Sequence, residues 1–256
     1  MELTLDVELA KRYQELKHVL HSLGRVLVAF SGGVDSALLA AAAYEVLGSD
    51  ALAVTAVSAS LPGRELKDAQ DLAQQIGIRH LLIETGELSD PRYANNPSDR
   101  CYFCKDTLYT RLQALADAES IQWICNGANV DDLGDFRPGE RAALEHRVRS
   151  PLREAGLNKI HIRELARQMG LSAWDKPAMA CLSSRVPFGL NITPEKLYQI
   201  EASENILHDL GYRQVRVRHH GDLARIEVEP AERSRLLEQA EEISEQLRQF
   251  GFSFIT

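Results

Sequence analysis

The clearest candidate for chemistry is a polar loop at residues 31–36, with the sequence Ser-Gly-Gly-Val-Asp-Ser. It follows the apolar run 26–30 and precedes an Ala- and Leu-rich stretch, which predicts a strand, a tight turn and a helix in succession. Adjacent glycines let the backbone approach a ligand closely, and the first turn of a helix leaves N–H groups free to bind phosphate. An ordinary strand-to-helix turn capped by Ser and Asp is the alternative. The complete pattern after a buried strand favours nucleotide binding.

This loop lacks the lysine of the other common phosphate-binding loop. A Walker A loop ends in Gly-Lys-Ser/Thr, and no lysine follows these glycines. Transfer of a γ-phosphoryl group is therefore not the expected chemistry. Backbone and hydroxyl donors of the loop suit a pyrophosphate, whereas its carboxylate suits Mg²⁺ or an orienting role. The candidate ligands are Ser31, Gly32, Gly33, Asp35 and Ser36.

Three cysteines form the second candidate group, Cys101-x-x-Cys104 and Cys181. A redox pair is expected in a thioredoxin-like context, which is missing here. Structural zinc usually takes four protein ligands, whereas three thiolates would leave one corner of a cubane iron–sulfur cluster open to hold a labile sulfide. Cluster or sulfur chemistry is favoured over zinc and over separate thiols. The fourth cysteine, Cys125, lies in an apolar run and is expected to be a buried small hydrophobe.

The elements that must position these groups follow from the hydrophobic pattern. Strands are expected at residues 25–30, 51–57, 79–84 and 121–126, and helices at 5–23, 36–47, 62–76, 106–118 and 160–169. Alternating strands and helices indicate an α/β fold with a doubly wound parallel sheet. Ligands of such sheets bind beyond the carboxyl ends of the strands. The loop 31–36, residues 58–60 and the polar segment 126–132 would meet there.

The pattern changes near residue 190. A helix starting at Thr193-Pro194, a hairpin of strands 213–219 and 223–229, a helix from Pro230 to about residue 250 and a last strand at 252–255 predict a small α+β unit. Two long loops, 85–104 and 174–189, precede it. We expect a nucleotide-binding domain at 1–188 and a smaller domain at 189–256 for substrate binding or oligomerisation.

Composition narrows the class of protein. The chain has 256 residues and a net charge of −8, which argues against a protein that grips long nucleic acid by electrostatics. No run approaches the length of a membrane span, and the N-terminus has no signal-peptide core. The cytoplasm is the expected location.

Several motifs resemble a known family. SGGVDS is similar to the PP-loop of the ATP pyrophosphatases, which implies cleavage of ATP between the α and β phosphates and an adenylated substrate. Together with DRCYFCK, NGANVDD, RPGERAA, SPLREAGLNK, WDKPAMACLSSRVPFG and VRVRHHGDLARIEV, it resembles the LarE family over nearly the whole chain. That resemblance implies an ATP- and Mg²⁺-dependent sulfurtransferase. Its substrate would be pyridinium-3,5-biscarboxylic acid mononucleotide, on the way to the nickel-pincer nucleotide of lactate racemase.

The resemblance leaves two sulfur sources. One branch of the family sacrifices a single cysteine, which becomes dehydroalanine, and Cys181 resembles that position. Another branch has three cysteines that look able to hold a [4Fe-4S] cluster and pass on its sulfide. With Cys101, Cys104 and Cys181 this chain looks like the three-cysteine branch. In either case a substrate carboxylate would attack the α-phosphorus, and sulfur would then displace AMP from the acyl-adenylate.

The matched motifs imply roles for further residues. Around the junction of ATP and substrate the resemblance implies Lys105, Asn129, Asp132, Arg137 and Lys176, with the two lysines as catalytic candidates. Ser58 and Gly127 are expected to bind ATP. The substrate phosphate is expected on Ser184, Arg185, Arg216 and Arg218, with Glu201 and Glu227 as weaker candidates. Alternation alone would make the two strand arginines a solvated face, and a charged helix face is the simplest account of Glu201.

Rival functions remain. A tRNA thiolase of the same superfamily also uses cysteines, but the acidic charge and the lack of an RNA-binding domain count against nucleic acid as a partner. An amidating synthetase would leave the cysteines idle. A nucleotide-sensing module with structural zinc is the non-enzyme alternative. A homo-oligomer is implied by the resemblance.

Overall fold

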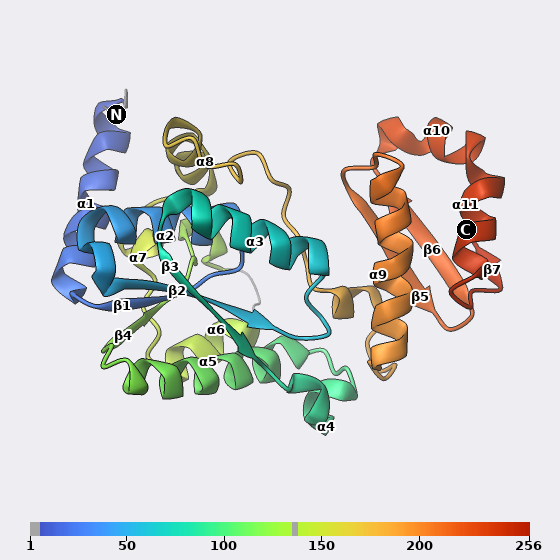
Figure 1. Cartoon of the computed structure of the whole chain (residues 1–256), viewed down its shortest axis with the longest axis horizontal. Coiled ribbons are helices and arrows are strands. Elements are labelled where there is room, and N and C mark those ends of the chain that lie inside the picture. The colour runs from blue at the N-terminus through green and yellow to red at the C-terminus, as the bar shows by residue number, and fades with distance from the viewer. Residues whose placement is uncertain (1–5, 135–137) are drawn as a thin grey trace. The chain divides into compact units, whose positions relative to one another are not determined.

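A computed structural model describes residues 6–134 and 138–256 of the chain (Figure 1). The described residues form two units. Unit 1 comprises those of Met1–Ser58, Gly63–Gly86 and Cys101–Ala178, and unit 2 comprises Ala59–Pro62, Glu87–Arg100 and Met179–Thr256. Short segments from the first half of the chain thus belong to the same unit as its C-terminal part, and the boundary expected at residue 188 stays a prediction.

Unit 1 is built on a four-stranded parallel sheet, as the sequence predicts. Its strands are β1 (Val26–Ala29), β2 (Ala51–Val57), β3 (Arg79–Glu84) and β4 (Trp123–Cys125). They are ordered β3-β2-β1-β4, with Val26 opposite both Ala51 and Trp123. The strand order reverses direction at β1, so the switch point lies between the carboxyl ends of β1 and β4, where ligands of such sheets bind.

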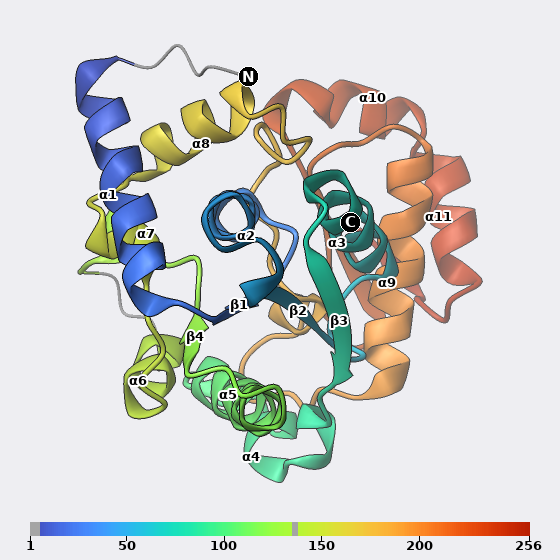
Figure 2. The same ribbon diagram turned by 60° about the vertical axis from the view of Figure 1, so that its left-hand side comes forward.

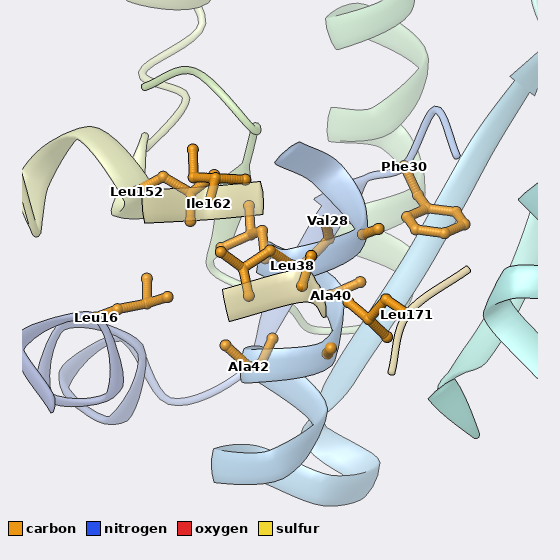
Figure 3. Close-up of a cluster of buried hydrophobic side chains, with 14 of the residues drawn as sticks. Leu16, Val28, Phe30, Leu38, Ala40, Ala42, Leu152, Ile162 and Leu171 are labelled. Atoms are coloured by element: carbon orange, nitrogen blue, oxygen red, sulfur yellow. The ribbon is translucent and has the colours of Figure 1, made fainter. Parts of the chain in front are cut away.

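Helices cover both faces of this sheet (Figure 2). One face carries α1 (Val7–Leu23), α2 (Val34–Leu47), α3 (Gly63–Ile76) and α8 (Lys159–Gln168). The other carries α5 (Arg100–Ala118) and α6 (Pro138–Glu145). Helix α2 is buried on nearly all sides because its alanines let neighbours approach closely, and its Leu38 meets Leu16 of α1 and Ile162 of α8 in one cluster (Figure 3).

Unit 2 contains the predicted second, small sheet. Strands β5 (Val215–His220) and β6 (Leu223–Val228) form an antiparallel hairpin, and β7 (Phe254–Ile255) pairs with β6 in parallel. Helices α9 (Pro194–Asp209), α10 (Arg233–Glu238) and α11 (Ala240–Arg248) surround it (Figure 1). Its core joins Leu207 of α9, Val217 of β5 and Leu247 of α11.

Two predictions of local structure were wrong. The predicted loop 85–104 contains α4 (Pro91–Ala94), capped by Asp90, and α5 begins at Arg100 instead of residue 106. Asn95-Asn96-Pro97 ends α4 but does not prevent a new helix three residues later, where the N–H of Arg100 bonds to the carbonyl of Pro97. The helix expected up to residue 250 is divided at Gln239 into α10 and α11.

The remaining elements are short. They are α7 (Pro151–Glu154) and the 3-10 turns η1 (Gly48–Asp50), η2 (Glu87–Ser89), η3 (Val130–Asp132), η4 (Leu182–Arg185) and η5 (Pro230–Glu232). Among the described residues, no helix combines the length and the apolar character needed to cross a membrane.

Shortening Leu38, which is 0% exposed, tests the core of unit 1. We expect Leu38→Ala to lower the free energy of unfolding by about 2–5 kcal/mol, because the lost contacts leave a cavity. Urea unfolding followed by tryptophan fluorescence reports on this unit, since Trp123 and Trp174 both belong to it. Leu144→Ala, at a leucine that is 73% exposed on α6, is the control. Equal losses in the two variants would contradict the assignment of the core.

Candidate active site

The loop after β1 folds back on the first turn of α2. Gly32 has φ +73°, and a Cβ there would lie 3.0 Å from the Cα of Ala69, so a side chain at this position would be strained. The hydroxyl of Ser36 accepts the N–H of Ser31 at 3.2 Å and donates to the carbonyl of Gly33 at 3.0 Å. Helix α2 thus begins beneath a tightly closed turn, the arrangement that presents N–H groups to a phosphate.

The backbone after β4 packs directly against this loop. A Cβ on Gly127 would lie 2.9 Å from the backbone nitrogen of Ser36, a distance that real Cβ atoms do not adopt. Asn129 is buried, and its amide donates to Asp35 Oδ1 at 3.1 Å. Asp132 in turn accepts the N–H of Asn129 at 2.9 Å. The structure therefore brings Gly127, Asn129 and Asp132 to the loop, at the switch point of the sheet.

Lys159 is a site residue that sequence reasoning missed. Its ammonium lies 2.7 Å from Asp35 Oδ1 and 2.5 Å from Oδ2. The backbone N–H of Lys159 donates to Asp131 Oδ2 at 2.8 Å. The nucleotide loop has no lysine of its own, so α8 supplies the cation from far along the chain. A signal was present, because Lys159 closes the motif SPLREAGLNK and follows the helix cap Asn158.

Two other predicted lysines have different surroundings. Lys176 is held by Glu65 at 3.0 Å and Asp68 at 2.7 Å on α3. Burial alone would lower the pKa of Lys176, but the hydrogen bonds to these carboxylates outweigh burial and raise the pKa. Lys105 is exposed on α5, and its Cγ lies 2.9 Å from where a Cβ on Gly139 would be.

The two other residues predicted for the nucleotide site are Ser58 and Arg137. Ser58 follows β2 and is partly buried. Arg137 lies outside the described residues.

The three candidate cysteines are divided between the two units. Cys101 and Cys104 lie one turn apart on α5 in unit 1, and Cys181 is exposed at the start of η4 in unit 2. Among the described residues, no three Cys, His, Asp or Glu side chains are arranged to hold a metal ion, and no disulfide is present. Neither unit by itself therefore fits an iron–sulfur cluster. Cys125 is buried, as predicted, and burial raises the pKa of its thiol to about 12.

Unit 2 contains a cationic pocket of about 240 Å³. It opens where Arg218 of β5 and Arg225 of β6 lie opposite each other in the hairpin. The pocket is lined by Arg100, Ser184, Arg185, Val186, Pro187, Phe188, Arg218, His220 and Arg225. Of the predicted substrate ligands, Ser184, Arg185 and Arg218 line it. Arg216 does not, and lies exposed opposite Glu227.

Like charges meet on this face of the hairpin. Arg218 and Arg225 are direct cross-strand neighbours, which is destabilising by itself. Both contact Glu227, at 2.7 and 2.8 Å. The hydrogen bond from Arg218 is the main cause that lowers the pKa of Glu227. Glu227 therefore stays ionised and holds both guanidinium groups in place.

Arg185 is engaged inside the protein. It is 1% exposed and pairs with Glu204, with Nε 2.9 Å from Oε1 and Nη2 3.1 Å from Oε2. Its Nη1 donates to the carbonyl of Cys181 at 3.0 Å, and Glu204 also accepts the N–H of Val217 at 2.9 Å. The pair thus fixes the Cys181 loop to α9 and β5.

Sequence reasoning chose Glu201 and missed Glu204. The buried positions of α9 include Ile200, Glu204 and Leu207, a helical spacing that places Glu204 toward the core. Glu201 lies to the side of this face and is only partly buried.

Comparisons with known proteins agree with this arrangement. The asparagine synthase family model matches residues 14–97, which contain the 31–36 loop. An uncharacterized Synechocystis protein is 46% identical over 97% of this chain and 93% of its own. The pyridinium-3,5-bisthiocarboxylic acid mononucleotide synthase of Lactiplantibacillus plantarum is 37% identical over 97% of this chain and 90% of its own.

The chain belongs to the LarE family. Members of this family are ATP-using sulfurtransferases with a PP-loop, and this chain is one of them. The tRNA-specific 2-thiouridylase MnmA of Azorhizobium caulinodans is 31% identical over 60% of this chain, which corresponds to 49% of MnmA. That relationship is at the level of the superfamily.

Removing the Lys159 ammonium tests its role at the PP-loop. We expect Lys159→Met to weaken ATP binding about tenfold or more, since a hydrogen bond to a charged group contributes about 1.5–3 kcal/mol. Calorimetric titration with ATP and Mg²⁺ measures this. Lys67→Met is the matched control, because Lys67 forms an ammonium–carboxylate pair with Asp71 on the exposed surface of α3. Unchanged ATP affinity in Lys159→Met would show that this cation serves only the fold.

Neutralising Glu204 tests whether the buried pair holds unit 2. We expect Glu204→Gln to lower the free energy of unfolding by about 3–5 kcal/mol, because the Arg185 guanidinium is left buried without its counter-charge. Faster amide hydrogen exchange in α9 and β5 would show that the loss of stability is centred on this pair. Glu245→Gln, at an exposed position of α11, is expected to change stability by less than about 0.5 kcal/mol. Similar protection in the two variants would argue against this role.

Proposed function

We propose that this enzyme adenylates the carboxylates of pyridinium-3,5-biscarboxylic acid mononucleotide and replaces carboxylate oxygen by sulfur. The product would serve in biosynthesis of the nickel-pincer nucleotide of lactate racemase. The observation that carries the proposal is the near full-length similarity to a synthase named for the bisthiocarboxylic acid product. The intact PP-loop geometry supports it from the chemical side.

The residues of unit 1 account for the activation step. The loop N–H and hydroxyl groups would bind the pyrophosphate portion of ATP, and Asp35 would hold Mg²⁺, which would neutralise charge on the leaving phosphates. A carboxylate oxygen of the substrate attacks the α-phosphorus, and the bond from that phosphorus to the pyrophosphate oxygen breaks. Lys159, whose ammonium contacts Asp35 at the loop, would take up negative charge on the departing pyrophosphate. The carboxylate becomes an acyl-adenylate.

The residues of unit 2 account for holding the substrate. Its cationic pocket has the charge and size for a phosphate group, and Ser184 and Arg218 line it, as the family resemblance implies. A sulfur nucleophile then attacks the carbonyl carbon of the acyl-adenylate, the bond to AMP breaks, and a thiocarboxylate forms. We also propose that the protein forms a homo-oligomer. Light scattering during size-exclusion chromatography would measure its mass in solution.

Two sources of sulfur are compatible with the cysteines of this chain. A [4Fe-4S] cluster on Cys101, Cys104 and Cys181 would require thiolates from both units, and sacrificial donation would require Cys181 alone. Cys181 is exposed, as either source requires.

Iron, sulfide and intact mass measured on anaerobically purified protein separate these sources. We expect iron and labile sulfide in the parent protein, their loss in Cys101→Ala and Cys181→Ala, and an unchanged protein mass after turnover. Cys125→Ala removes a buried thiol and is the control that should retain iron. Loss of hydrogen sulfide from Cys181 without any iron would instead establish sacrificial donation.

Pyrophosphate release tests the activity itself. We expect release that depends on the dicarboxylate mononucleotide and not on tRNA. Release that depends on tRNA would favour the thiolase alternative.

A further inference from the structure

Arg100 is a buried cation that has no counter-ion among the described residues. The residue is 4% exposed, and its Nη1 donates to Asn96 Oδ1 and, at 2.9 Å, to the carbonyl of Ser183. Its guanidinium carbon lies 5.6 Å from the centre of the Phe188 ring. Among the residues that the structure describes, no carboxylate contacts this guanidinium. A buried charge of this kind is costly unless something pairs with it.

The unpaired side of Arg100 is available to the cationic pocket. A guanidinium has five N–H donors, and within the described chain no partner bonds to Nε or Nη2 of Arg100. Neither nitrogen is sealed from solvent, and Arg100 is part of the pocket lining. Donors in this fork geometry match two oxygens of one phosphate.

The position of Arg100 is fixed before any ligand arrives. Asn96 is fully buried and donates to the carbonyls of Val186, Pro187 and Leu190. The same amide accepts from Arg100 through its oxygen. The guanidinium is therefore anchored to the loop that forms the pocket wall, and a ligand has little side-chain entropy left to remove.

The charge balance of the pocket lining favours a dianionic ligand. Four guanidinium groups line it. Arg185 is paired with Glu204, and Arg218 and Arg225 share Glu227. Counting only the part of the chain that the structure describes, two of these four positive charges have no carboxylate partner, which matches a phosphate monoester, whose second pKa is about 6.

We infer that Arg100 is a substrate-binding residue that selects for the phosphate monoester of a mononucleotide. This inference rests on the proposed function for the identity of the substrate. It assigns the selection to a residue from the first half of the chain, in addition to the Ser184 and Arg218 positions. The riboside that lacks the phosphate would leave Arg100 unpaired, and the enzyme would reject it for that reason.

The test compares a pyridinium mononucleotide with its riboside. Nicotinamide mononucleotide, nicotinamide riboside and inorganic phosphate are titrated calorimetrically into the parent protein, Arg100→Lys and Arg100→Gln. We expect about a tenfold loss of affinity for the mononucleotide and for phosphate in both variants, with riboside binding unchanged, since about 1.4 kcal/mol corresponds to tenfold. Arg92→Gln is the control, because Arg92 is an exposed arginine on α4 that pairs with Asp90. Mononucleotide affinity within twofold of the parent protein in Arg100→Lys would overturn the inference.

Two further measurements keep the result unambiguous. If neither variant folds, a crystal structure of the parent protein with nicotinamide mononucleotide decides, and a phosphate oxygen away from Nε and Nη2 of Arg100 would overturn the inference. In the full reaction we expect Arg100→Lys to raise KM for the dicarboxylate with kcat retained, because the phosphate contact is the same in ground and transition states.

The proposed function fails separately. If Arg100 governs mononucleotide binding but no pyrophosphate is released with the dicarboxylate, the reaction assignment falls and the phosphate contact stands. If release depends on the dicarboxylate while KM is unchanged in Arg100→Lys, the inference falls and the reaction stands.

Discussion

The close approach of two backbones, at Gly127 after β4 and at Asp35–Ser36 after β1, constrains the rest of unit 1. Any side chain at Gly127 would occupy the space of the Ser36 peptide, so the ends of these strands can meet only as bare main chain. Because they meet, Asn129 reaches the Asp35 carboxylate, and the loop after β4 also carries Asp131, which holds the start of α8. The position of the Lys159 ammonium follows from that contact.

Unit 2 solves a different electrostatic problem, because it gathers arginines in a small space. Two carboxylates partly neutralise these arginines. Glu204 pairs with the buried guanidinium of Arg185, and Glu227 pairs with both Arg218 and Arg225, which line the pocket. Buried ion pairs of this kind contribute little net stability compared with apolar residues of the same size. Their value here lies in fixing where the remaining positive charge is exposed.

The sequence predicted the sheet well and the long-range contacts poorly, for physical reasons. Strands β2 and β3 matched to the residue because short β-branched and apolar runs are bounded by turn-forming residues. The PP-loop was recognised because its chemistry is local. Lys159 contacts Asp35 across 124 positions of the chain, and no periodicity encodes such a pairing. Helix α5 was predicted too late because the sequence pattern places Asn95-Asn96-Pro97 within one long loop over residues 85–104, whereas it only separates two helices.

Burial of Cys125 gives the protein an internal reporter. Its thiol is inaccessible and its high pKa leaves almost no thiolate at neutral pH, so a thiol reagent reaches it only when the sheet opens. The rate at which this sulfur is alkylated therefore measures the opening of strand β4. The other three cysteines are exposed or partly exposed, so they can be alkylated without any opening of the sheet. Rapid alkylation of these three with slow alkylation of Cys125 therefore indicates modified sulfur-chemistry cysteines in a folded protein, whereas rapid alkylation of Cys125 indicates loss of the fold.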